Sequence, residues 1–540
     1  PKPPTAPTAP PAVGGRTVTL QAIEFRGNHA IPTAELNALA QDYLNRPLTG
    51  DDLADLRHHV TLYYVNKGYI SSGAKIEKQS ITDGGTLLVE IVEGELTRVQ
   101  VTDNTAAGDG KNWRGSSWMP PLNDSYYADR LLADNHLAGL IDGGDQALNT
   151  RDLQERYLLL LNDPLVRQLN GTLLPGLKRG EAVLDLKVVR ARPYGAYLEA
   201  NNFSPPSVGG YAGRIGGWVR NLSGFGETVN FDFITTGGSN TYNTGIDIPL
   251  SARGTRFAFR YTNSENTLIE APFDTLDVNS NIISYDGQLS QVLWRNLQQA
   301  VTWGLNFNIR QDRTTIAGAP FNRPGASDGQ TQETVVRNWF DYVHQRREFD
   351  VALRTTFSVG VDALGATITN QVGDGRFFAW LGQGYGRYWL PHDDTFIPDG
   401  ASVSLSGAVQ VTDDKLLPLE KMAIGGVYTV RGYRQNYLVR DEGFYASLQL
   451  SYPLYRLWGG EWNARRNVSA VPFFSYGGAW DYEEKGDYVS STGLGLEARY
   501  DNFSGSVYWA QRLDSYRLTP GTPYDLQDNG VTFQVRWESQ

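Results

Sequence analysis

The chain has 540 residues, no cysteine and a formal net charge of −11, with a pI near 5.2. The absence of cysteine excludes disulfide bridges, thiol catalysis and thiolate metal sites. The acidic balance argues against a nucleic-acid-binding protein, which needs a basic surface to displace the counterions of the phosphate backbone.

The aromatic residues divide the chain into two regions. Of its 21 Phe, 13 Trp and 29 Tyr, only ten lie in residues 1–192. No stretch approaches the ~20 consecutive apolar residues of a membrane helix. Strands of a membrane barrel need only about ten residues each and carry polar side chains at alternate positions, which agrees with the mean hydropathy of −0.38. The sequence thus excludes a helical membrane protein and is compatible with a membrane barrel.

Residues 1–15 hold six prolines, so we expect residues 1–16 to form an extended tether. Residues 17–95 predict a small α/β domain in the order strand, helix, helix, strand, strand. Its second helix is expected to be capped by Asp51 or Asp52 and to end at Gly68, which supplies a left-handed residue. The last two strands are expected near 70–78 and 86–94.

Residues 96–192 repeat that order, with a helix near 150–161 and strands near 166–173 and 182–190. They also carry an insertion rich in Gly, Asp and Asn at about 104–148. Two similar modules in tandem are therefore predicted. The strands at 70–78 and 166–173 are candidate edges that an incoming peptide would extend through main-chain hydrogen bonds. Solvated edge strands without a ligand are the alternative.

After Pro193 the apolar residues recur at every second position. In residues 301–309, every odd position is apolar and every even position is Thr, Gly or Asn. A soluble β-sandwich alternates in the same way, but it must bury its apolar face against a second sheet. The abundance of aromatic residues favours a transmembrane antiparallel β-barrel over residues 193–540, with lipid outside and a hydrated lumen inside.

The segments between turn signals predict about 16 strands, and the longest connection, residues 413–442, precedes the twelfth. The expected strands are 193–202, 209–220, 227–236, 240–250, 254–264, 278–292, 298–310, 331–343, 348–358, 376–391, 399–412, 443–455, 468–479, 488–500, 503–512 and 530–537. A barrel of this size encloses a wide channel unless something fills it.

The long connection contains the sequence Val430-Arg431-Gly432-Tyr433. Two α/β modules, about 16 strands and this motif together resemble the TpsB outer-membrane transporters of two-partner secretion, which are related to the BamA assembly proteins. The resemblance covers residues 17–537. It implies a bacterial outer-membrane pore with two periplasmic POTRA domains. It also implies that loop 413–442 folds into the barrel and that Arg431 engages the inner wall. We expect Gly432 to permit a backbone conformation that a side chain would block, and Tyr433 to pack against the wall.

The resemblance further implies the partner. TpsB transporters recognise a large exoprotein of the adhesin or cytolysin type, with an N-terminal recognition domain, and export it unfolded without nucleotide hydrolysis. A plug helix that is common in the family is not expected in the proline-rich residues 1–15.

The family's wall motif, Phe-x-Asp-x-Gly on the thirteenth strand, corresponds to Phe473, Ser475 and Gly477 here. Period two places these three residues on one face, which the family pattern makes the lumen. Because Ser475 replaces the aspartate, the family's ion pair to Arg431 cannot form at that position. Glu497 has the parity to face the same lumen, and we expect it to pair with Arg431. A solvated glutamate unrelated to the loop is the alternative.

Three other functions are weaker interpretations. The adjacent His58 and His59 point about 100° apart on a helix and cannot chelate a metal together, so we expect no enzyme, cofactor or metal. A BamA-like insertase usually carries more than two modules. A gated porin would explain the barrel but not the two modules of residues 17–192. The expected partners are the exported protein and outer-membrane lipid, and we expect a monomer.

Overall fold

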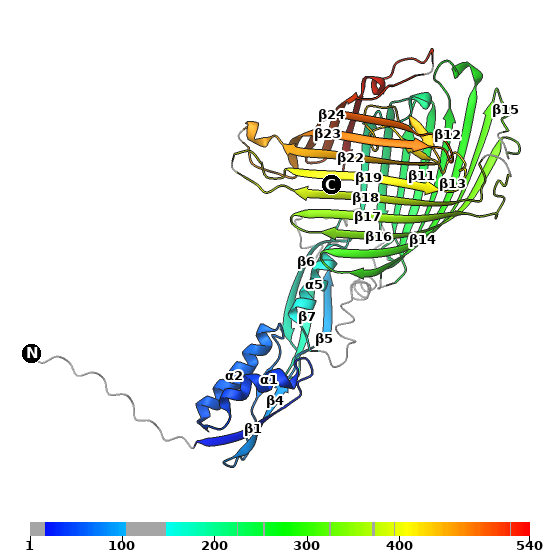
Figure 1. Ribbon diagram of the computed structural model, residues 1–540. Helices are drawn as coiled ribbons and strands as arrows, with labels where there is room; N and C mark the ends of the chain where they lie inside the picture. The colour runs from blue at the N-terminus through cyan, green and yellow to red at the C-terminus, as the bar shows by residue number, and fades with distance from the viewer. Residues whose placement is uncertain are drawn as a thin grey trace, which may run out of the picture. The chain divides into compact units, whose positions relative to one another are not determined.

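The computed structural model describes residues 17–103 and 147–539, apart from residues 224, 252–253, 323–325, 370–372, 394, 459 and 519. The expected tether at 1–16 and nearly all of the insertion lie outside the described residues. The chain divides into two compact units, one ending at Ala191 and the other beginning at Arg192 (Figure 1). In the described part of the chain, no helix is long and apolar enough to cross a membrane.

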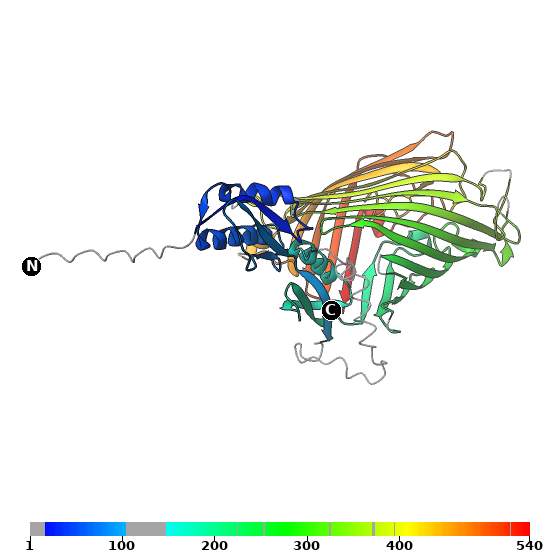
Figure 2. The same cartoon turned by 90° about the horizontal axis from the view of Figure 1, so that it is seen from below.

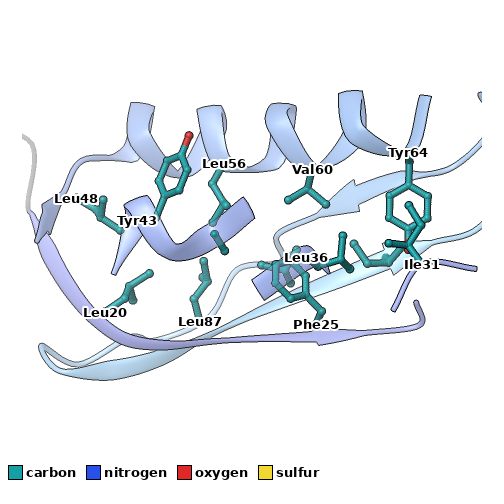
Figure 3. Packing of buried hydrophobic residues seen from close by; sticks show 13 residues of the cluster. Leu20, Phe25, Ile31, Leu36, Tyr43, Leu48, Leu56, Val60, Tyr64 and Leu87 are labelled. Carbon is teal, nitrogen blue, oxygen red and sulfur yellow. The ribbon is translucent and has the colours of Figure 1, made fainter. Parts of the chain in front are cut away.

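The first module is a four-stranded sheet in the order β2-β1-β4-β3, with β1 parallel to β4. Its elements are β1 (Val18–Arg26), α1 (Thr33–Ala40), the 3-10 turn η1 (Gln41–Tyr43), β2 (Pro47–Leu48), α2 (Gly50–Asn66), β3 (Gly73–Lys75) and β4 (Gly85–Val92). Leu56, Val60 and Tyr64 of α2 recur every four residues and are fully buried. They pack over the sheet residues Leu20 and Leu87 (Figure 3). One helical stripe thus closes the core.

The start of α2 differs from the prediction. Thr49, not Asp51 or Asp52, is the N-cap, and its side chain accepts a hydrogen bond from the Asp52 amide. The Asp52 carboxylate accepts in return from the Thr49 amide at 2.7 Å. This reciprocal capping box places the acidic residue three positions into the helix. The predicted end is correct, since Gly68 follows the helix with φ +101°.

The sheet of the second module repeats three of the four strands of the first, without a counterpart of β2 among the described residues. Its elements are β5 (Glu95–Asp103), α5 (Thr150–Leu161), β6 (Val166–Pro175) and β7 (Glu181–Arg190). The sheet order is β5-β7-β6, with β5 parallel and β6 antiparallel to β7, as β1 and β3 are to β4. Both parallel pairs shift register near their start, at Leu20/Ala22 and at Leu96/Arg98. The predicted internal repeat is therefore present in the backbone.

The second unit is a closed antiparallel β-barrel of 16 wall strands, which confirms the predicted fold class. The colour of the wall runs continuously from the cyan β8 to the red β26, which close the barrel (Figures 1 and 2). The wall strands are β8 (Tyr194–Asn201), β9 (Ala212–Arg220), β10 (Thr228–Thr235), β11 (Ser239–Pro249), β12 (Thr255–Thr267), β13 (Val278–Arg295), β14 (Gln299–Ile316), β16 (Gln330–Gln345), β17 (Phe349–Gly360), β18 (Phe378–Trp389), β19 (Ser402–Thr412), β22 (Glu442–Pro453), β23 (Arg466–Trp480), β24 (Asp487–Tyr500), β25 (Phe503–Arg512) and β26 (Val531–Glu538).

Short elements accompany the wall strands in the connections. They are the strands β15 (Ala319–Pro320), β20 (Met422–Ile424) and β21 (Leu438–Arg440), and the 3-10 turns η3 (Pro206–Val208), η4 (Asp274–Leu276), η5 (Tyr455–Trp458) and η6 (Leu526–Asn529).

The two faces of the wall carry different chemistry. On β14, Leu305 and Phe307 are 39% and 40% exposed on the outside, whereas Asn306 and Asn308 are buried inside. Asn306 and Asn308 both donate hydrogen bonds to Asp286 of the neighbouring strand, at 2.8 and 3.3 Å. An apolar exterior around a polar interior is the arrangement that a membrane barrel requires.

Candidate functional site

The connection between β19 and β22 folds back against the inside of the barrel. Its strands β20 and β21 pair only with each other, so the loop adds no hydrogen bond to the wall ladder. Val430 and Tyr433 are fully buried and join an apolar cluster with Ala479 of β23 and Val489 of β24. The loop is therefore packed on the wall by side chains, as the resemblance implied.

Arg431 of this loop contacts three wall strands, β22, β23 and β25. Its guanidinium donates to Ser447 Oγ at 3.3 Å and to Gln449 Oε1 at 3.1 Å. The same group lies 4.7 Å from the ring centroids of both Phe473 and Tyr508. A cation over two aromatic faces is stabilised electrostatically without an anion.

The wall motif takes part in this site. Phe473, Ser475 and Gly477 are all buried on the inner face of β23; their parity predicts the shared face, and the family pattern implies that it is the lumen. Ser475 Oγ lies 2.8 Å from Ser447 Oγ, so it supports the group that accepts from Arg431 and does not itself contact the arginine. Gly477 leaves room for Val430, whose Cγ2 lies 3.0 Å from the position a Cβ would take.

Glu497 does not form the direct ion pair with Arg431 that the sequence suggested. Among the described residues, no carboxylate oxygen lies within 4.0 Å of the Arg431 guanidinium, and its buried Nε has no hydrogen-bond partner. Glu497 instead accepts a hydrogen bond from the Tyr508 hydroxyl. The ring of Tyr508 therefore stands between the two charges.

Two glycines make room for the rings that hold Arg431. A Cβ on Gly493 would lie 2.6 Å from Phe473 Cζ, and one on Gly495 would lie 2.3 Å from the ring of Tyr508. Both distances are too short for any side chain. The Gly493-x-Gly495-x-Glu497 pattern of β24 is thus explained by close approach of the two rings.

The last two residues of the motif position the loop. Gly432 has φ +91°, a conformation that other residues rarely adopt, and its carbonyl accepts from Arg512 at 2.7 Å. The Tyr433 hydroxyl donates to the Ser490 carbonyl at 3.1 Å. Its ring packs against Tyr437 and Tyr516, in agreement with the expected packing.

The sequence reasoning missed Arg434. This residue binds the β12–β13 and β25–β26 connections, which lie at the barrel rim away from the start of β8. Arg434 makes two 2.7 Å hydrogen bonds to the Asp528 carboxylate and a third of 2.7 Å to Glu270. The side chain of Asp528 is fully buried. No sequence pattern links Arg434 to Glu270 or to Asp528, which lie 164 and 94 positions away. The one available signal was that Arg434 directly follows the motif.

A further ionic anchor, also missed, holds the start of the loop. Glu420 accepts from Arg337 at 2.5 and 2.7 Å, and Arg310 donates to the Leu419 carbonyl at 3.0 Å. Lys421 pairs with Asp441 at 3.0 Å and with Asp481 at 2.6 Å. Ion pairs thus hold the loop at Glu420 and Lys421, before the motif, and at Arg434, after it. At Arg431 the loop is held by neutral groups.

The two candidate recognition edges lie in the modules. β3 ends the first sheet and β6 ends the second. β3 has three residues, whereas β6 has ten, and Leu174 of β6 is 42% exposed. Of the two histidines of α2, His59 has its Nδ1 2.6 Å from the Tyr43 hydroxyl, a contact within the first module.

Comparison with known proteins identifies the family. Residues 180–500 match the haemolysin secretion/activation proteins ShlB/FhaC/HecB, and residues 18–94 match the ShlB-type POTRA domain. The chain belongs to the ShlB/FhaC/HecB family. It is therefore an outer-membrane transporter with N-terminal POTRA domains and not an enzyme, and its family exports partner exoproteins.

Relatives in this family share a modest fraction of the sequence. The outer membrane transporter CdiB of Dickeya dadantii (strain 3937) is 24% identical over 83% of this chain and 74% of its own. The heme/hemopexin transporter protein HuxB of Haemophilus influenzae (strain 86-028NP) is 21% identical over 91% of this chain and 86% of its own.

Solved structures share the fold. CdiB from Escherichia coli superimposes with a TM-score of 0.69 at 18% identity, covering 99% of this chain and 93% of that one. BamA from Haemophilus ducreyi, lacking POTRA domains 1–3, gives 0.54 at 12% identity, covering 97% and 100%. The relation to BamA that the sequence implied is thus present in the architecture.

Proposed function

We propose that loop 413–442 is the gate of the export channel and that Arg431 is its releasable central anchor. The observation that carries this proposal is the contact of Arg431 with neutral groups only, on the three wall strands β22, β23 and β25. All of these contacts are made by side chains. The loop is therefore able to leave the wall without breaking any hydrogen bond of the barrel ladder.

The lumen suits an extended polypeptide as cargo. An unfolded chain cannot leave its amides unpaired in lipid, where each unsatisfied group costs several kcal/mol. Inner-face side chains such as Asn306, Asn308 and Asp286 offer donors and acceptors along the path. With the loop in place, Val430 and Tyr433 occupy the inner wall, so displacement of the loop is the step that would admit the cargo.

We further propose that the modules recognise the partner, with β6 as the receiving edge. A ten-residue edge strand presents a row of main-chain groups for strand addition, and the exposed Leu174 adds an apolar contact. The three-residue strand β3 presents fewer main-chain groups for strand addition. The partner is a large secreted exoprotein of the adhesin or cytolysin type that carries a recognition domain at its N-terminus.

The test of the gate is Arg431→Ala, with Arg354→Ala as the matched control. Arg354 is also an inner-wall arginine, but it contacts the wall residues Asp341 and Trp339. We expect Arg431→Ala to impair secretion of the partner while the barrel assembles normally, and Arg354→Ala to secrete normally. Wild-type secretion by an Arg431→Ala protein of wild-type abundance contradicts the proposal.

The test of recognition is deletion of residues 97–190 in the otherwise complete chain. We expect the partner's N-terminal fragment to bind the full chain and not the deleted one, with both barrels folded by heat-modifiable electrophoretic mobility. Binding that survives the deletion contradicts recognition by the second module and leaves the gate proposal standing.

A further inference from the structure

The outer face of the barrel carries an apolar groove that the export function does not use. It has a volume of about 860 Å³ and crosses β16, β17, β18, β19 and β22, which follow one another along the wall (Figure 1). Its sides include Phe340, Leu353, Trp380 and Leu405. A second, smaller outer hollow of about 480 Å³ lies where the barrel closes, at Leu198, Ile215, Phe503 and Val535.

The register shows that the groove faces outward. Leu353 and Leu405 are 50% and 53% exposed, and residues paired across antiparallel strands project to the same face. Leu353 pairs with Gly384, and Leu405 pairs with Gly386. The floor of the groove is therefore backbone on the lipid side of the wall.

One side of the groove is fixed in place. The Trp380 indole lies 3.0 Å from the position of a Gly382 Cβ and donates through Nε1 to Thr355 Oγ1 at 2.8 Å. Its only polar atom is thus satisfied within the wall. The groove offers an apolar surface and no free donor from this ring, which suits a hydrocarbon and not a polar ligand.

The groove begins near the periplasmic rim at Gly386 and runs away from that rim to Trp380. β8 begins at Tyr194, directly after the periplasmic modules, so its first residue marks the periplasmic rim. β18 runs toward that rim and ends at Trp389. Gly386 lies three residues before this end, about 10 Å along the strand at ~3.3 Å per residue. The lipid layer beside this end of the groove is therefore the inner leaflet.

Two exposed cations stand at the rim beside the groove. Arg346 and Arg347 occupy the turn between β16 and β17 and are exposed. Both strands line the groove through Tyr342 and Val351. Guanidinium groups at this depth match the phosphate of a lipid headgroup, which they bind with charge-assisted hydrogen bonds.

We propose that this groove binds one acyl chain of an inner-leaflet phospholipid, whose phosphate is held by Arg346 and Arg347. The groove is continuous with the lipid-facing surface of the barrel, and the charge at its rim is complementary to the headgroup. A phospholipid held in this way dissociates more slowly than the lipid around the rest of the wall.

The test is native mass spectrometry of the full chain in mild detergent, titrated with phosphatidylglycerol. Gly386→Leu fills the groove, because nothing lies within 4 Å of the position of its Cβ. Gly287→Leu is the matched control: it also faces lipid, opposite Phe307, and its Cβ would meet only the Phe307 carbonyl at 3.9 Å. We expect one retained lipid in the wild type and in Gly287→Leu, and about tenfold weaker retention in Gly386→Leu, which corresponds to roughly 1.4 kcal/mol.

A double variant, Arg346→Ala with Arg347→Ala, tests the headgroup contact. We expect it to weaken retention of the phospholipid while leaving a long-chain alcohol, which lacks phosphate, unaffected. Equal retention by the wild type and Gly386→Leu overturns the proposal, since the lipid is then bound around the whole wall. A dimer mass in the wild type that disappears in Gly386→Leu also overturns it, because the groove then holds a second copy of the chain.

Discussion

Arg431 and Arg434 are three residues apart in one loop, yet the wall and the rim hold them in opposite ways. Arg431 contacts two neutral oxygens and two rings. Arg434 contacts two carboxylates, one of them with a fully buried side chain. Removing one partner of a buried ion pair leaves an uncompensated charge. When a cation moves away from aromatic rings, by contrast, only neutral groups remain on the wall. The comparison suggests that the rim holds the loop closed and that the wall site lets it go.

The largest effect is expected from Arg434→Ala. The substitution leaves Asp528 buried without its cation, at a cost of about 3–5 kcal/mol, and frees two connections at once. We expect channels that open spontaneously in planar bilayers, with Arg354→Ala behaving as the wild type. Quiet, closed channels in the Arg434→Ala protein would show that the rim contact does not hold the loop.

The next effect is expected from Tyr508. Tyr508→Leu removes one ring from Arg431, worth about 2 kcal/mol for a desolvated cation–π contact. Tyr508→Phe keeps the ring and removes only the hydroxyl bound to Glu497. We expect more frequent openings in Tyr508→Leu than in Tyr508→Phe. Equal opening frequencies would mean that the hydroxyl and Glu497 hold Arg431, and that the ring does not.

Ser475→Asp converts the neutral site into an ionic one. A carboxylate beside Ser447 would lie near the Arg431 guanidinium, and once the pair has formed, separating it would leave a buried charge without its partner. We expect fewer spontaneous openings and slower secretion, with Ser475→Asn as the uncharged control. Faster opening in Ser475→Asp would contradict the view that the neutral contact is what makes the loop releasable.

The smallest effect is expected far from the loop. Thr49→Ala removes the cap of α2 and should lower the stability of that helix by about 1 kcal/mol. Hydrogen exchange should accelerate at the first amides of α2, while channel openings remain at the wild-type frequency. A change in openings would show that the first module acts on the gate.

The barrel could be predicted from the sequence, because apolar residues alternate along each strand and the alternation stops at each turn. Strand 503–512 was predicted to the residue, and the helix at 150–161 likewise. The cap at Thr49 was missed since two aspartates follow it and both are good capping residues.

The candidate site could be predicted only where a short pattern carries it. Parity placed Phe473, Ser475 and Gly477 on one face of their strand, and the family resemblance implied that this face is the inner one. It could not show that Tyr508 would come between Glu497 and Arg431, because a ring from the next strand is invisible to spacing within one strand. Glu270 and Asp528 could not be predicted as partners of Arg434 for the same reason, since the closure of the barrel brings them together and no local sequence pattern does.

The central claim is that loop 413–442 rests on the inner wall and leaves it during export. The chain has no native cysteine, and Val430 is fully buried at rest, so Val430→Cys reports loop release through labelling by a membrane-impermeant maleimide added outside the cell. We predict protection in cells that lack the partner and labelling while the partner is being secreted. Protection that persists during secretion, or full labelling without the partner, would contradict the account.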